Sequence, residues 1–127
     1  MLAAMSIRHV DHINIATRKL EETRAFFVDV LGLKEGYRPP FDFPGYWLYA
    51  GDAAVVHMQL ASQDVGPSDA SALNHFAFDV DDLDSLLARL DGHGVPYRAV
   101  GVPGTEIRQA FLHDPNGVRV ELNFKPR

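Results

Sequence analysis

The two halves of this 127-residue chain repeat one order of predicted elements, and this repeat limits the possible fold more than any other feature. Each half begins with an alternating apolar strand, continues with an amphipathic helix and ends with three further strands. The first strands are residues 10–17 and 74–80, and the helices are residues 18–32 and 81–94. Such a duplication predicts an α+β fold of two βαβββ modules that form a curved mixed sheet.

Each module is expected to close with a hairpin of two strands. These strands are residues 46–50 and 53–60 in the first half, and residues 107–114 and 117–124 in the second. The small, polar segment "ASQDVGPSDAS" lies between the halves and is expected to be a linker. We therefore predict one domain over residues 1–127, with module 1 at about 8–60, a linker at 61–73 and module 2 at about 74–124.

Charge and cysteine content restrict the classes of function. The formal net charge of −5 disfavours nucleic acid, because binding phosphates requires clustered Lys and Arg. The absence of cysteine excludes disulfides and thiolate metal sites, and it fits a reducing compartment. The N-terminus lacks the basic region of a signal peptide, and no stretch approaches the length of a membrane span. We expect a cytoplasmic protein with a small-molecule partner and with neither nucleic-acid nor membrane partners.

Four side chains that can bind a metal fall at equivalent positions when the two halves are aligned. His12 aligns with His75 in the first strands, and His57 aligns with Glu121 in the last strands. Each of the four alternates with the main apolar series of its strand, so we expect all four on one concave face of the sheet. Three imidazoles and one carboxylate form a suitable ligand set for a divalent transition metal with room for substrate.

One histidine on an open sheet face is more often solvated or hydrogen-bonded than bound to a metal. The metal prediction therefore depends on the paired arrangement, and His57 is its weakest member. Three residues could bind the metal while the fourth acts as a base or supports a ligand. His9, His93 and His113 lie outside the pattern, and we expect surface or structural roles for them.

Aromatic residues cluster in and after the proline-rich segment "RPPFDFPG" of the first half. They could line an apolar substrate pocket, or they could belong to the core or to an interface. The residues assigned to this pocket are Phe41, Phe43, Trp47 and Tyr49. On the strand before that of Glu121, we expect Arg108 and Gln109 to reach a substrate carboxylate or carbonyl.

The segments "VDHINIATRKLEETRAFFVDVLGL" and "FLHDPNGVRVELNF" resemble the opening and closing signatures of the vicinal oxygen chelate superfamily. This superfamily includes glyoxalase I, methylmalonyl-CoA epimerase, extradiol dioxygenases, and fosfomycin and bleomycin resistance proteins. The resemblance covers nearly the whole chain. It implies metal ligands at His12, His57, His75 and Glu121, one divalent metal per site (Fe, Ni, Co, Zn or Mn), and a homodimer.

The first function that the resemblance implies is a metal-dependent lyase or isomerase of glyoxalase type. Its substrate would offer two adjacent oxygens to the metal, which stabilises an enediolate while Glu121 or His57 carries the proton. His57 departs from the family pattern, because glyoxalase I-like and epimerase-like members have Glu or Gln at this position.

Two alternatives follow from the same residues. In an Fe(II) extradiol-type dioxygenase, His12, His75 and Glu121 would form a face of two histidines and one carboxylate, with His57 as an acid or base. A resistance protein that sequesters a small molecule would need a pocket but no turnover. The complete set of two histidines and one glutamate argues against this last alternative.

Overall fold

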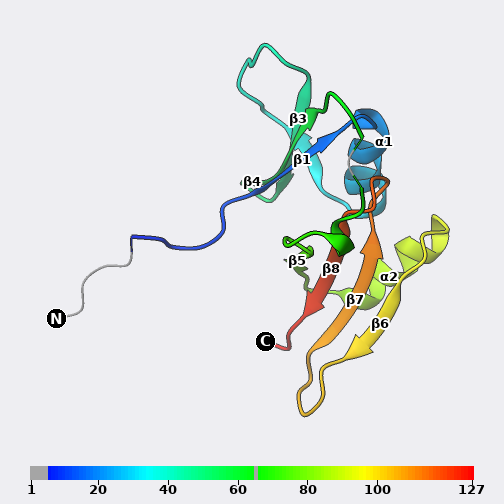
Figure 1. The fold of residues 1–127 in the computed structure, drawn as a ribbon. Coiled ribbons are helices and arrows are strands. Elements are labelled where there is room, and N and C mark those ends of the chain that lie inside the picture. Colours follow the sequence, from blue (N-terminus) through cyan, green and yellow to red (C-terminus); the bar gives the residue numbers. More distant parts are fainter. Residues whose placement is uncertain (1–5, 65) are drawn as a thin grey trace.

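Two four-stranded sheets form the framework of the computed structural model, which describes residues 6–64 and 66–127 (Figure 1). The first sheet has the order β1-β4-β3-β2, with β1 (Ile13–Thr17), β2 (Lys34–Gly36), β3 (Gly45–Ala50) and β4 (Ala53–Leu60). The second has the order β5-β8-β7-β6, with β5 (His75–Asp79), β6 (Arg98–Gly101), β7 (Arg108–His113) and β8 (Arg119–Phe124). The predicted α+β fold of two βαβββ modules is confirmed.

The strands of both sheets pair in the same way. The first strand of each module runs parallel to the last, and the remaining neighbours are antiparallel. In the parallel pairs, Asn14 lies opposite His57 and Ala77 lies opposite Glu121. His57 and Glu121 therefore occupy equivalent places in the two sheets, as the internal alignment predicted.

Each module contains one helix between its first and second strands. Helix α1 (Leu20–Ala25) continues directly into a π-helical turn, η1 (Phe26–Val30), where the sequence predicted one regular helix over residues 18–32. The wider turn buries the adjacent side chains of Phe26 and Phe27 together. Helix α2 (Leu83–Gly92) is capped by Asp82, whose carboxylate accepts the backbone N–H of Ser85 at 3.0 Å.

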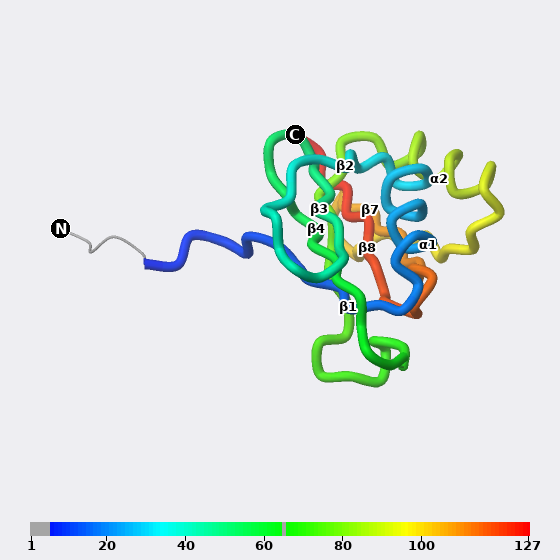
Figure 2. Tube along the Cα trace, turned by 90° about the horizontal axis from the view of Figure 1, so that it is seen from above, coloured from blue at the N-terminus to red at the C-terminus, as the bar shows by residue number. Residues whose placement is uncertain are grey.

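The helices join the modules. Figure 2 shows α1 and α2 side by side on one side of the sheets. The ring of Phe27 is fully buried, and its centre lies 6.4 Å from the ring centres of Phe76 and Phe78 on β5. From α2, Arg89 donates hydrogen bonds to the backbone carbonyls of Val30 and Asp29 at 3.0 and 2.8 Å. Residues of one module thus complete the core of the other.

A buried polar network adds a second connection between the modules. Asn116, in the turn between β7 and β8, accepts a hydrogen bond from the Thr17 hydroxyl at 2.5 Å and donates one to the Thr23 hydroxyl at 3.0 Å. Asp114 is buried, and its carboxylate accepts the backbone N–H groups of Asn116 and Val118 at 2.8 Å each. These bonds satisfy groups that would be costly to bury unpaired.

The two sheets remain separate in the described part of the chain, whereas the sequence pattern favoured one curved sheet. Strands β1 and β5 are edge strands, and no hydrogen-bonded ladder joins them within the residues described. A cavity of about 570 Å³ lies between them, and linker residues that include Ser68 help to line it. The linker contains a short 3₁₀ helix, η2 (Ser68–Ala70).

The N-terminal arm, residues 6–12, extends away from both sheets (Figure 1). Two of its apolar side chains, Ile7 and Val10, are 77% and 81% exposed. Neither helix of the described residues has the length and apolar character needed to cross a membrane.

Replacing Phe27 with Ala should lower the free energy of unfolding by about 3–5 kcal/mol, because the ring fills the contact between the modules. Urea denaturation followed by circular dichroism measures this change. Ile7→Ala is the control, and it should alter stability by less than about 0.5 kcal/mol because the side chain is exposed. A loss below about 1 kcal/mol for Phe27→Ala would contradict this account of the core.

Candidate metal centre

One pair of the predicted ligands meets in module 2. The Nε2 atom of His75 on β5 lies 3.3 Å from Oε1 of Glu121 on β8. The carboxylate of Glu121 is buried, and its other oxygen accepts a hydrogen bond from the Gln109 amide at 3.2 Å. Oε1 therefore remains turned toward His75.

The tautomer of His75 follows from its neighbour. Its Nδ1 lies 2.8 Å from the side-chain oxygen of Asn74, which can only accept a hydrogen bond. A neutral His75 then carries its proton on Nδ1 and directs the lone pair of Nε2 toward Glu121. Two acceptors at this distance repel each other unless a cation, either a proton or a metal ion, lies between them. Ligands about 2.1 Å from one metal are about 3.0–3.4 Å apart, so the pair fits a shared metal.

The other pair lies in module 1. The rings of His12, just before β1, and His57, on β4, are stacked with their centres 3.7 Å apart. Trp47 of β3 covers the opposite face of the His57 ring, with the centres 4.0 Å apart. The Nδ1 of His12 lies 2.7 Å from the Asp11 carboxylate, so this nitrogen donates and Nε2 stays free to bind a metal.

Burial lowers the pKa of His57, and the positive charge that His12 can carry acts in the same direction. The hydrogen bond from His12 lowers the pKa of the Asp11 carboxyl. The first effect favours a neutral His57 imidazole near neutral pH, and the second favours an ionised Asp11 carboxylate. Neutral imidazole is the form that binds metals and accepts protons.

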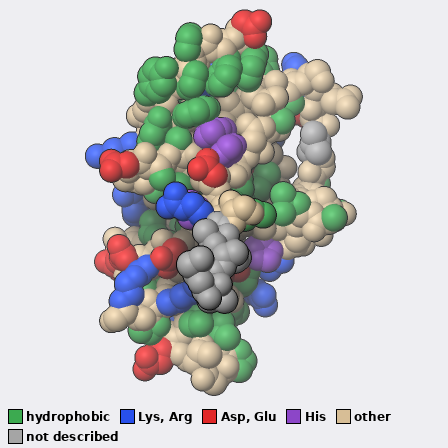
Figure 3. All heavy atoms as spheres, turned by 90° about the vertical axis from the view of Figure 1, so that its left-hand side faces the viewer, with side chains coloured by type: hydrophobic (Ala, Val, Ile, Leu, Met, Phe, Trp, Pro, Cys, Tyr) green, Lys and Arg blue, Asp and Glu red, His purple; other side chains and the backbone are tan. Residues whose placement is uncertain are grey.

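The two pairs do not form a single cluster. Across residues 6–64 and 66–127, no group of three or more His, Cys, Asp or Glu side chains is placed to hold a metal. His12 and His75 both line a cavity of about 540 Å³ between the N-terminal arm and β5. In Figure 3, histidine side chains accordingly occupy more than one place on the face shown. Each module carries half of a ligand set.

The expected pocket residues form a row that leads away from His57. The rings of Phe41 and Phe43 stack with their centres 5.2 Å apart, and Phe41 lies 6.3 Å from Trp47. Trp47 in turn stacks on His57, so these aromatic faces are continuous with the candidate ligands. Tyr49 has another contact, because its hydroxyl donates to the backbone carbonyl of Tyr37 at 2.5 Å.

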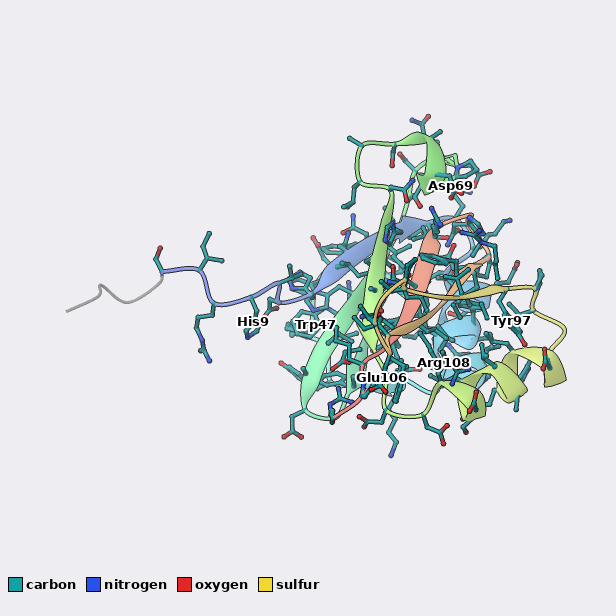
Figure 4. All side chains as sticks on the ribbon, turned by 90° about the horizontal axis from the view of Figure 1, so that it is seen from below. His9, Trp47, Asp69, Tyr97, Glu106 and Arg108 are labelled. Atoms are coloured by element: carbon teal, nitrogen blue, oxygen red, sulfur yellow. The ribbon has the colours of Figure 1, made fainter. Side chains whose placement is uncertain are left out.

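Arg108 and Gln109 are neighbours on β7 but point to opposite faces of the sheet, although both were expected to contact the substrate. Neighbouring residues of a strand point to opposite faces, and the side of Gln109 is the side of Glu121. Arg108 instead donates to the Asp84 carboxylate of α2 at 2.9 Å, and Figure 4 shows Arg108 on the α2 side of the molecule. This ion pair directs Arg108 toward the helix, whereas Gln109 lies beside a candidate ligand.

Sequence reasoning missed three residues beside the ligands. Phe111 lies opposite Glu121 in β7, as Trp47 lies opposite His57 in β3, and its ring meets the ring of His75 edge-on at 6.1 Å. Arg119 lies 4.5 Å above the ring centre of Phe111. The third is Arg38, in the loop before β3. The internal alignment that matched His57 with Glu121 could have found Phe111, because the same offset matches Trp47 with it.

His113 has a structural contact outside both pairs. Its Nε2 lies 2.8 Å from the Asp69 carboxylate of η2, a contact that lowers the pKa of Asp69 and connects the linker to β7. This agrees with the structural role expected from the sequence.

Comparisons with known proteins agree with this architecture. The family model for the Glyoxalase/Bleomycin resistance protein/Dioxygenase superfamily matches residues 9–122. The chain is 32% identical to the uncharacterized protein YaeR of Escherichia coli over 93% of this chain and 97% of that protein. It is 27% identical to Glyoxylase I 4 of Arabidopsis thaliana over 93% of this chain and 71% of that protein. A glyoxalase family protein from Bacillus anthracis has the same fold, with a TM-score of 0.82 at 23% identity, over 98% of this chain and all of that one.

The His57 imidazole should titrate with a midpoint below the value of about 6.5 that is usual for histidine. Proton NMR of the metal-free protein measures this midpoint, and His57→Gln identifies the resonance. Because the folded state then binds the proton less readily than the unfolded state, His57 should reduce stability as the pH falls below about 6.5. A midpoint at or above that value would contradict the role of burial.

Proposed function

Because the chain belongs to the Glyoxalase/Bleomycin resistance protein/Dioxygenase superfamily, we propose that it is a divalent-metal-dependent lyase or isomerase of glyoxalase type. Its substrate is a small molecule with two adjacent oxygens. The observation that carries this proposal is the His75–Glu121 pair, in which a ring nitrogen and a buried carboxylate oxygen face each other at 3.3 Å, a spacing that either a proton or a shared metal ion can bridge. The relative named Glyoxylase I 4 supports the reaction type.

The residues that would hold the metal are His12 from module 1 and His75 and Glu121 from module 2, with His57 as a fourth ligand or as a base. Their nitrogen and oxygen donors suit Fe, Ni, Co, Zn or Mn. A bound divalent metal would supply Lewis acidity to the two substrate oxygens.

We further propose that a second copy of the chain completes each site. The two pairs lie on separate sheets, and β1 and β5 have free edges that can accept another chain. Apolar side chains of the N-terminal arm and of Leu73 are exposed beside these edges. In a twofold dimer, module 1 of each protomer would face module 2 of its partner.

Two side chains can move the substrate proton. Glu121 is buried and held at one oxygen by Gln109, so its other oxygen keeps a fixed direction. His57 is held between Trp47 and His12, and its lowered pKa keeps it available as a base at neutral pH. Proton transfer by a positioned group of this kind contributes about 10²–10⁴-fold to a rate.

The stack around His57 also favours a second candidate function. With both ring faces covered, His57 can stand outside the ligand set, which leaves His12, His75 and Glu121. Two histidines and one carboxylate suit an Fe(II) oxygenase with open positions for a catecholate and O₂.

Metal binding to mixed variants tests the shared site. The wild type should bind about one Zn(II) per chain, and His12→Ala and His75→Ala should each lose it because each removes a ligand. After the two variants are unfolded and refolded together, half of the chains in mixed dimers should regain a metal, because one of the two sites again has all its ligands. Isothermal titration calorimetry measures the stoichiometry.

The control for this experiment is His93→Ala, which changes an exposed histidine and should bind as the wild type does. No recovery in the mixture would show that each site lies within one chain. No binding to the wild type would contradict the metal proposal itself.

Exchange of carbon-bound hydrogen tests the chemistry. In D₂O, the Ni(II)- or Co(II)-loaded wild type should exchange the hydroxymethylene hydrogens of hydroxyacetone faster than metal and buffer alone, as followed by NMR. If His57 is the base, His57→Gln should keep the metal and slow exchange by about 10²-fold or more. Absence of exchange, with oxygen uptake by the Fe(II) form in the presence of catechol, would favour the dioxygenase.

A further inference from the structure

Arg38 has no polar partner among the described residues, in contrast to Arg18 and Arg24 of the same module. Arg24 pairs with Glu21 and Glu35, and Arg18 donates to the backbone carbonyl of Ala61. The Nε atom of Arg38 is buried and makes no hydrogen bond. Buried donors are almost always paired, so an unpaired one in a folded protein calls for an explanation.

The guanidinium of Arg38 is nevertheless held in one place. Its central carbon lies 5.0 Å from the ring centres of both Phe41 and Phe43. On another side it approaches the backbone of Gly45, where an added Cβ would come within 2.8 Å of Nη2 and 3.0 Å of Cζ. Cation–π contacts and a residue without a side chain thus form a cradle for the cation. The guanidinium is positioned before any ligand arrives.

This cradle adjoins the candidate metal centre. Gly45 lies opposite Gln59, two residues from the Trp47–His57 pair on the same two strands, so all four residues face the same side of the sheet. The aromatic row from Phe43 through Phe41 and Trp47 connects the cradle to His57. The positive charge of Arg38 also contributes to the lowered pKa of His57. A ligand of modest size can therefore contact Arg38 and the candidate metal centre at the same time.

We propose that Arg38 anchors an anionic group of the substrate, and that the site takes a small molecule with a carboxylate or phosphate attached to an apolar part. A guanidinium presents paired N–H donors that match the oxygens of either group. The aromatic row receives the apolar part. The proposal rests on the proposed function for the two adjacent oxygens, whereas the anion anchor itself requires no metal.

A purely structural role for Arg38 makes a different prediction. If the side chain only fixes the loop at residues 38–45, its loss should disturb neutral and charged ligands equally. An anion anchor should affect charged ligands alone. The preference for an acid over its neutral amide therefore separates the two roles.

Trp47 is the only tryptophan of the chain and lies in the aromatic row, so its fluorescence can report binding there. The probes are phenylacetate, phenyl phosphate and the neutral phenylacetamide, titrated into the full-length, metal-free protein. At least one acid should bind about tenfold tighter than the amide. Comparing the affinities for phenylacetate and phenyl phosphate then shows whether the site prefers a carboxylate or a phosphate.

Arg38→Gln should lower the affinity for the acids by about tenfold, to that of the amide, and should leave the affinity for the amide unchanged. Arg24→Gln is the matched control, since it removes one positive charge from module 1 at an ion pair outside the site, and it should keep the preference. Arg38→Lys keeps the charge but not the planar fork, and its affinity should fall in between.

Equal binding of acids and amide by the wild type would overturn the inference, as would an unchanged preference in Arg38→Gln or no binding of any probe. A Zn(II) titration of the same proteins separates this result from the proposed function. If the protein prefers the acids through Arg38 but binds no Zn(II), the metal-dependent function is contradicted and the anion anchor stands. Metal binding without the preference would contradict the anion anchor alone.

Discussion

The parallel pairing of the first and last strands in each module is the constraint on which the rest of the structure depends. It places His57 beside β1 and Glu121 beside β5, at equivalent registers. Because side chains alternate along a strand, the apolar partners of these residues turn inward together and form the core. A slip of one residue would bury the ligands and expose Val56 and Val120, which are now fully buried.

The two ligand pairs are held by different forces, and this gives them different chemistry. His75 and Glu121 are fixed by hydrogen bonds from their outer atoms, which leaves two acceptors facing each other. His12 and His57 are stacked ring on ring, and burial lowers the pKa of His57, which favours its neutral form. The first pair favours a cation and the second favours proton transfer, so a complete centre needs both modules.

The arginines of the chain differ in their partners according to where they lie. The chain has a net charge of −5, yet Arg38 and Arg119 lie over aromatic rings of the two modules and form no ion pair with a carboxylate in the described structure. Arginines on the outer surface, such as Arg108 and Arg127, are neutralised by aspartates. If Arg38 anchors an anion as proposed, the net negative charge of the chain favours a small anion over a large polyanion, which the remaining surface would repel.

The sequence by itself determined the repeat, the two modules and the face on which His12, His57, His75 and Glu121 lie, because strand alternation is a local property that a period of two reveals. Only the tertiary structure decided which ligands meet, that Arg108 turns to Asp84 while Gln109 holds Glu121, and that Arg38 lies against Gly45. It also kept β1 and β5 in separate sheets. These outcomes depend on contacts between segments distant in the chain, whose relative placement no local pattern encodes.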